Sequence, residues 1–305
     1  MGRQLGWVWF GGRGARIYCI PDFNNAGNQF GIIDTASNNL TLTTLNADPQ
    51  VDYRWDAVAV IGTKIYCIPY ANDAGNQFGI IDTAANSLSL TTLGVNPQID
   101  YQWNTAVVVG TKIYCIPYAN DAGNQFGIID TAANSLSLTT LGANPQARYT
   151  WSTAVVVGTK IYCIPAFFEA GNQFGIIDTA SNNLTLTTLN ADPQVDYRWF
   201  SAVVVGTKIY CIPAFNTGGN QFGIINTETN TLTLTTLGAD PQAGYTWLSA
   251  VVVDTKIYCI PYLNGAGNQF GIIDTETNTL TLTTLNADPQ GDYRWRSTAA
   301  VLPLI

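Results

Sequence analysis

The chain has 305 residues, of which 47% are hydrophobic and only 11% are charged, and its formal net charge is −8. This acidic balance disfavours nucleic acid and anionic membranes as partners, because both require a basic surface. The chain contains no histidine, which excludes Ser-His-Asp and Cys-His catalysis and every metal site with an imidazole ligand.

A period of 48 residues organises the chain. It is marked by six cysteines, and tryptophans recur with the same step from Trp7 to Trp295. A unit of this length made of short strands cannot bury its own faces, so it must stack against neighbouring units. Six units plus 17 further residues predict an all-β protein. We expect one domain over residues 1–305, folded as a six-bladed β-propeller with four antiparallel strands in each blade.

Both ends of the chain align with the first strand of blade one. Residues 289–305 match residues 1–17, but glycines interrupt the apolar run of residues 7–14. We therefore predict that residues 297–305 form the strand that closes blade one. Residues 1–15 become an N-terminal tail, which we expect against the short-turn side of the disc or in the channel mouth.

The second unit illustrates how each blade is expected to fold. Apolar runs and alternation predict four strands, with the first two buried on both faces, over residues 57–61, 64–68, 78–81 and 87–93. The connection between the first and second strands and the connection between the third and fourth strands are short. The two remaining connections are long and fall on the opposite face of the disc, where we expect recognition to be built.

An apolar strand, then Thr-Lys-Ile-Tyr-Cys-Ile-Pro, then Ile-Ile-Asp-Thr-x-x-Asn-x-Leu, together resemble a kelch repeat, and the resemblance covers all six units. It implies a propeller that binds a peptide or protein on its long-loop face. Three positions depart from the family pattern. Pro69-Tyr70 replaces a glycine pair, Leu88 replaces the tryptophan of the fourth strand, and Trp55 replaces an arginine that often begins the first strand. Because the third departure replaces an arginine by a tryptophan, the ligand contacts that the resemblance implies would differ at this position.

The cysteines resemble an even-numbered disulfide set, but their placement argues against pairing. Each occupies the same position in its own sheet, and facing sheets lie about 10 Å apart. A disulfide needs Cα atoms within about 7 Å. We therefore predict six free, buried thiols. Together with an N-terminal apolar run too short for a signal peptide, they favour a cytoplasmic location.

Repeated polar residues are expected to have structural roles. An aspartate begins the turn before each fourth strand, except that blade five has Asn226, and such a side chain can bond nearby backbone amides. The series comprises Asp34, Asp82, Asp130, Asp178 and Asp274. A second series, Arg16 with Lys64, Lys112, Lys160, Lys208 and Lys256, stands beside the other short turn and could attract an anion or remain solvated. Because catalysis needs one asymmetric constellation, six similar units predict no enzyme, and we expect no cofactor and no metal.

The best ligand-binding candidates are the tryptophans and their neighbours on the long-loop side. The tryptophans can either stack on a ligand or pack as spacers between blades. The full candidate set is Trp55, Trp103, Trp151, Trp199, Trp247, Trp295, Arg54, Arg198, Arg294, Tyr70, Asn72, Asp73, Tyr118, Asn120, Asp121 and Phe167.

These observations favour a non-enzymatic binding module that takes a peptide or protein on the face formed by the long loops. One alternative is a lectin with similar sites around the ring, gaining strength by avidity. Another is a structural or engineered repeat scaffold without a specific ligand. We expect a monomer, because blade closure needs no partner chain.

Overall fold

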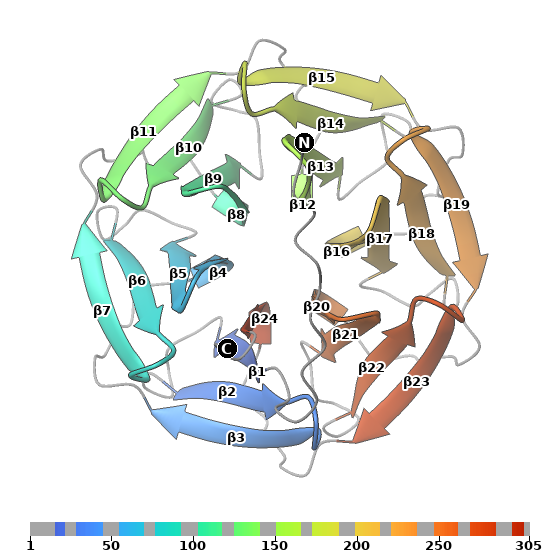
Figure 1. Ribbon diagram of the computed structural model, residues 1–305, viewed down its shortest axis with the longest axis horizontal. Helices are drawn as coiled ribbons and strands as arrows, with labels where there is room; N and C mark the ends of the chain where they lie inside the picture. The colour runs from blue at the N-terminus through green and yellow to red at the C-terminus, as the bar shows by residue number, and fades with distance from the viewer. Residues whose placement is uncertain are drawn as a thin grey trace, which may run out of the picture.

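The computed structural model describes 24 strands and the short turns that join some of them. The described residues are 16–21, 29–44, 55–69, 77–92, 103–117, 125–140, 151–165, 173–188, 199–213, 221–236, 247–261, 269–284 and 295–301. The strands form six four-stranded antiparallel sheets arranged radially around a central axis (Figure 1). The all-β, six-bladed propeller is therefore confirmed.

Each blade contributes one strand to each of four concentric rings. The innermost strands are β24 (Trp295–Val301), β4 (Trp55–Ile61), β8 (Trp103–Val109), β12 (Trp151–Val157), β16 (Trp199–Val205) and β20 (Trp247–Val253). The second strands are β1 (Arg16–Pro21), β5 (Lys64–Pro69), β9 (Lys112–Pro117), β13 (Lys160–Pro165), β17 (Lys208–Pro213) and β21 (Lys256–Pro261). The third strands are β2 (Gln29–Asp34), β6 (Gln77–Asp82), β10 (Gln125–Asp130), β14 (Gln173–Asp178), β18 (Gln221–Asn226) and β22 (Gln269–Asp274). The outermost strands are β3 (Asn39–Thr44), β7 (Ser87–Thr92), β11 (Ser135–Thr140), β15 (Asn183–Thr188), β19 (Thr231–Thr236) and β23 (Thr279–Thr284).

Blade one is closed by the C-terminal end of the chain. Its sheet has the order β24-β1-β2-β3, and the ladder pairs Arg16 with Val301 and Ile20 with Ser297. The predicted closing strand is confirmed, although β24 begins at Trp295, two residues earlier than expected. The predicted position of the tail over residues 1–15 lies outside the described residues.

Several strands are longer than the apolar pattern predicts. The β6–β7 ladder runs from Gln77 opposite Thr92 to Asp82 opposite Ser87, so polar residues at both ends belong to the sheet. Backbone hydrogen bonds keep these polar end residues in the sheet, and the periodicity of apolar residues cannot predict such pairing. The same reason extends β4 back to Trp55, which lies opposite Pro69.

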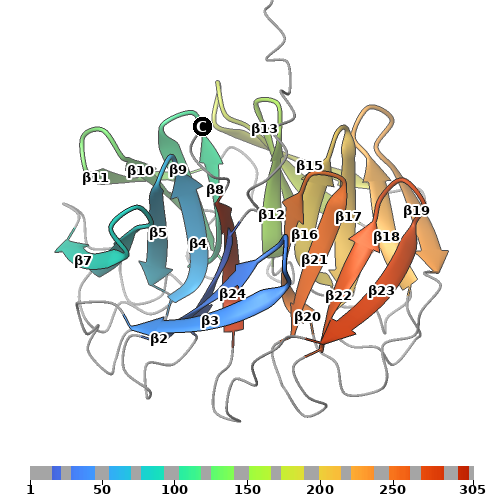
Figure 2. The ribbon, with the colours of Figure 1, turned by 60° about the horizontal axis from the view of Figure 1, so that its bottom comes forward.

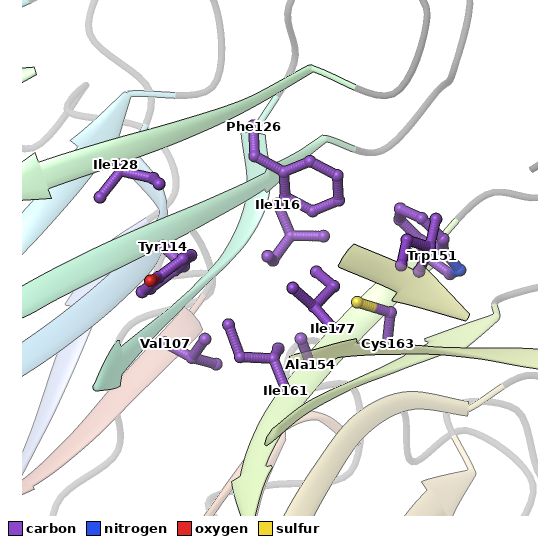
Figure 3. Packing of buried hydrophobic residues seen from close by; sticks show 11 residues of the cluster. Val107, Tyr114, Ile116, Phe126, Ile128, Trp151, Ala154, Ile161, Cys163 and Ile177 are labelled. Atoms are coloured by element: carbon purple, nitrogen blue, oxygen red, sulfur yellow. The ribbon is translucent and has the colours of Figure 1, made fainter. Parts of the chain in front are cut away.

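Six apolar clusters form the core, one at each interface between adjacent blades. Alternate residues of β5 belong to different clusters: Ile65 and Cys67 pack with blade one, whereas Tyr66 and Ile68 pack with blade three. All four are buried, which confirms that the second strand is sandwiched on both faces. Figure 3 shows the interface of blades three and four, where residues of both sheets interdigitate.

The short turns on one face of the disc are joined to each other. The amide and the hydroxyl of Thr83 both donate hydrogen bonds to the carbonyl of Thr63, each 2.9 Å long. Four further blades repeat this bond with Thr131, Thr179, Thr227 and Thr275. Asn86 occupies the left-handed region with φ of 49°, a conformation that asparagine tolerates. Figure 2 shows these turns along one rim of the disc.

Removal of residues 297–305 should strip the innermost strand from blade one and leave the edge of β1 unpaired. Losing a whole ladder costs several kcal/mol, so we expect the melting temperature to fall by more than about 10 °C. Differential scanning calorimetry measures this. A matched deletion of residues 302–305 keeps every pair of the β24–β1 ladder. Similar melting of the two deletion variants would contradict closure by β24.

Candidate functional site

A β-bulge at the start of each inner strand decides where the tryptophans lie. In β4 the ladder shifts register between Trp55 and Ala57, so residue 56 is an extra residue in the strand. Ala57 and Ala59 pack towards blade three, and simple alternation would place Trp55 on their side. Trp55 instead packs towards blade one together with Val58 and Val60. The bulge therefore turns the indole to the other face of its strand.

Each described indole lies across its own blade on a glycine of the third strand. A Cβ added at Gly79 would come within 2.6 Å of Cζ2 of Trp55, and one at Gly223 within 2.3 Å of Cζ2 of Trp199. Gly79 is paired with Cys67, and Cys67 with Val58. The indole thus spans from the first strand over the second to the third, and only a residue without a side chain leaves room for it.

The other side of the tryptophan meets a phenylalanine of the preceding blade. The ring centroids of Phe126 and Trp151 are 5.8 Å apart, and those of Phe78 and Trp103 are 6.3 Å apart. Both distances lie in the range of favourable tilted aromatic pairs. Trp103 and Trp151 are consequently wedges between two sheets, as Figure 3 shows for Trp151.

This packing corrects the interpretation of the tryptophans as a ligand platform. The five tryptophans with described side chains are between 0% and 4% exposed: Trp55, Trp103, Trp151, Trp199 and Trp247. Rings this deeply buried offer no face to a sugar or peptide, and the spacer interpretation accounts for them. The indole nitrogens of Trp55, Trp103 and Trp247 are also buried and make no hydrogen bond to any described residue.

The remaining candidates are not tested by the described residues. The backbone of Trp295 lies at the start of β24. The others fall in the long connections, outside the described ranges: Arg54, Arg198, Arg294, Tyr70, Asn72, Asp73, Tyr118, Asn120, Asp121 and Phe167. Their proposed role in recognition therefore stays a prediction.

The six cysteines are free and buried, as predicted. Each is 0% exposed in the middle of a second strand. Burial raises the pKa of all six thiols, because an apolar interior disfavours the thiolate. Reactive cysteines need the opposite environment, with a nearby cation and access to solvent. These thiols therefore serve as small apolar side chains.

The aspartates that begin the short turns are capping residues, as predicted. Oδ1 of Asp82 accepts hydrogen bonds from the amides of Ala84 and Ala85, and Asn226 accepts one from Glu228 in blade five. Backbone hydrogen bonds, first of all from Ser37, hold the pKa of Asp34 below its usual value. The pKa of Asp178 and Asp274 is lowered for the same reason.

The basic series on this face stands opposite the same aspartates. Lys64 pairs with Asp82 across the ladder, and Lys160 with Asp178. Attraction from Lys160 also contributes to the lowered pKa of Asp178. Lys208 differs, because its ladder partner is Asn226. Most of these cations thus face a carboxylate, which weakens the series as an anion-binding ring.

The extra residue of each bulge was absent from the candidates that the sequence suggested. These residues are Asp56, Asn104, Ser152, Phe200, Leu248 and Arg296. The only sequence signal is that the position after each tryptophan differs in every unit. The alternation of apolar and polar residues does not indicate where the register shifts.

A scan of the chain against protein-family models and a search of curated proteins both found no match. Within the described ranges, no group of three Cys, Asp or Glu residues is placed to hold a metal ion. The same residues include no helix that is long and apolar enough to cross a membrane.

Substitution of Gly223 by alanine should force the new methyl group against Trp199. Because the added Cβ would lie 2.3 Å from the indole, we expect a loss of about 1–3 kcal/mol in the free energy of unfolding. Gly175 is the matched control, because its nearest atoms are 3.0 Å away at the flexible end of Leu184 and 3.1 Å away on Trp151. Urea unfolding should show a larger loss for Gly223→Ala than for Gly175→Ala. Equal losses would contradict the wedge.

Alkaline pH should destabilise the protein steeply. The thiol pKa is raised in the folded state, so the stabilisation is complete below the unfolded value of about 8.5 and is lost as pH rises. Each thiol contributes a slope of up to about 1.4 kcal/mol per pH unit, and six contribute up to about 8 kcal/mol per pH unit. Urea unfolding at pH 7, 9 and 10 measures this slope, and Cys115→Ala should reduce it by about one sixth. A flat profile, or native thiols that react with Ellman's reagent, would contradict it.

Proposed function

We propose that the protein is a non-enzymatic interaction module that binds a peptide or protein on the face formed by the long loops. The six-bladed propeller is an architecture commonly used as a protein-interaction scaffold. The kelch-like pattern of the repeats supports the same function by analogy of fold alone. The observation that carries the proposal is the difference between the two faces of the disc.

The short-turn face uses its repeated polar groups for internal hydrogen bonds. Thr83 donates both its amide and its hydroxyl to the carbonyl of Thr63 in the other short turn of the same blade. The hydroxyl of Tyr18 in blade one donates long hydrogen bonds to the carbonyl of Thr83 and to Oδ1 of Asn86 in blade two. These residues recur in nearly every blade, so this face repeats one chemistry around the ring.

The opposite face has connections of a different kind. The chain crosses from β5 to β6 through residues 70–76 and from β7 to β8 through residues 93–102. The four residues after the proline of the second strand vary from Tyr-Ala-Asn-Asp at 118–121 to Ala-Phe-Phe-Glu at 166–169. Long, diversified connections on a rigid frame are the usual location of binding residues.

The burial of the tryptophans separates this proposal from the lectin alternative. Six equivalent aromatic platforms were the main support for sugar binding, and five of those rings lie between blades. The buried, protonated thiols likewise offer no nucleophile for catalysis. A protein or peptide ligand can instead use the variable loop residues, which do not need to be equivalent.

Panning the full chain against a phage-displayed random peptide library tests the proposal. Selected peptides should bind at least about tenfold more weakly when residues 166–169 are replaced by Tyr-Ala-Asn-Asp. Two other blades carry that loop already, so folding should be preserved. The exposed Glu228 of the short-turn face provides the control Glu228→Ala, which should leave binding unchanged. Binding only on a glycan array would favour the lectin, and no binding in either assay would contradict both.

A further inference from the structure

We propose that two copies of the chain associate through the outer edge of blade one, with β3 of one copy pairing antiparallel with β3 of the other. The two four-stranded sheets then form one continuous sheet across the dimer. A two-fold axis at Leu42 places this residue directly opposite its own copy. The inference goes beyond peptide binding by the long loops, because it uses the rim of the disc.

The outer side of β3 is a sheet edge. The strand order of blade one is β24-β1-β2-β3, and β3 lies on the rim of the disc in Figure 1. Within the described part of the chain, no further strand pairs with it. The backbone groups along a sheet edge are a template for another extended strand. The edge therefore specifies the kind of occupant before any side chain is considered.

Sheet edges are normally protected from such pairing by charged residues, by proline or by a bulge. The outermost strands contain no charged residue and no proline, and each reads as alternating Leu and Ser, Thr or Asn with a Thr-Thr end. The β2–β3 ladder runs from Gln29 opposite Thr44 to Asp34 opposite Asn39 without a shift of register. A regular, uncharged strand rich in threonine is well suited to pair with a second strand.

The exposure of one leucine distinguishes blade one from the other five. Leu42 is 36% exposed, and among the described side chains it is the one large hydrophobic group that is exposed. Its equivalents pack against the apolar clusters between blades: Leu90, Leu138, Leu186, Leu234 and Leu282. Contact between two Leu42 side chains removes apolar surface of both from water. This gain favours the edge of blade one over the other edges.

Strand alternation determines how two such edges meet. Directly opposite residues of an antiparallel pair point to the same face of the sheet, so a two-fold pairing places one residue opposite its own copy. With Leu42 at this position, Thr41 of each copy lies opposite Thr43 of the other. None of these three residues carries a charge. Two chains of net charge −8 can therefore approach here without bringing like charges into contact.

The dimer should be weak, because its interface consists of one pair of short strands. Stable, specific interfaces bury about 1,200–2,000 Å² in total. The monomer is complete at low concentration, since blade closure needs no second chain. Added salt should strengthen the dimer by screening the repulsion between two acidic copies, whereas an interface held by ion pairs would be weakened.

Sedimentation velocity of the full chain tests the association. A reversible monomer–dimer equilibrium should appear between about 10 µM and about 500 µM protein. Leu42→Lys should weaken it at least about tenfold, because it places two like charges directly opposite each other. The matched control Thr233→Lys adds the same charge at an exposed position of another outermost strand and should leave the equilibrium unchanged. Both changes are at exposed positions, so melting should match that of the unmodified chain.

Disulfide trapping tests the register. Opposite residues of an antiparallel pair have Cα atoms about 4.5–5.5 Å apart, within the range that a disulfide spans. Leu42→Cys should therefore form a covalent dimer on mild oxidation. Two copies of residue 41 are diagonal neighbours at about 7–8 Å, so Thr41→Cys, which is also exposed, should form at least about tenfold less. The six native cysteines are buried and should stay reduced.

A chain that stays monomeric over the whole concentration range would overturn the dimer. Equal association of Leu42→Lys and Thr233→Lys, or cross-linking of Thr41→Cys as efficient as that of Leu42→Cys, would overturn the pairing through β3. Peptide binding by the long loops is measured separately on the library-selected peptides. Its success or failure therefore leaves this test unaffected.

Discussion

The packing of a tryptophan between neighbouring blades is the constraint on which the propeller depends, and the structure describes it for five of the six tryptophans: Trp55, Trp103, Trp151, Trp199 and Trp247. The indole of Trp103 lies against Gly127 of its own blade and Phe78 of the preceding one. Three features must coincide for this: the tryptophan, a bulge that turns it, and a glycine two strands away. The tryptophan and the glycine recur in every unit of the sequence, and the register shift recurs in every ladder between the first two strands of a blade. Because the described tryptophans are buried at equivalent places in their blades, neighbouring sheets meet in the same way, and six such sheets form the ring.

The wedge also explains why the most constant residues are not the functional ones. Trp103, Cys115 and Phe126 are all 0% exposed, and their constancy reflects six copies of one packing problem. A change at any of them creates a cavity or a clash that costs several kcal/mol. Residues that touch a ligand are free of this demand and can differ between blades. In a protein built from repeats, recognition is therefore sought where the copies disagree.

Much of the architecture follows from the sequence because the period carries it. Six cysteines at one spacing predict six sheets, and placing each cysteine at the same depth predicts that none is paired. The alignment of residues 289–305 with the N-terminus predicts the closing strand. The tryptophans were harder to interpret. A large aromatic at the start of a strand, beside a polar loop, is compatible with either a surface or an interface. The register shift that buries Trp55 exists only in the ladder with β5, and alternation of residue types does not reveal it.

The same bulge is also the point at which the symmetric fold departs most from sequence symmetry. Six identical sites would favour repeated, weak binding and a gain by avidity. The position after the tryptophan of each inner strand instead carries six different residue types, from Asp56 to Arg296, while the rest of the strand keeps one pattern. The wedge uses the extra residue of the bulge to turn Trp151 towards the preceding blade. Packing thus fixes the tryptophan between blades, whereas the sequence varies at the very next position of the same strand.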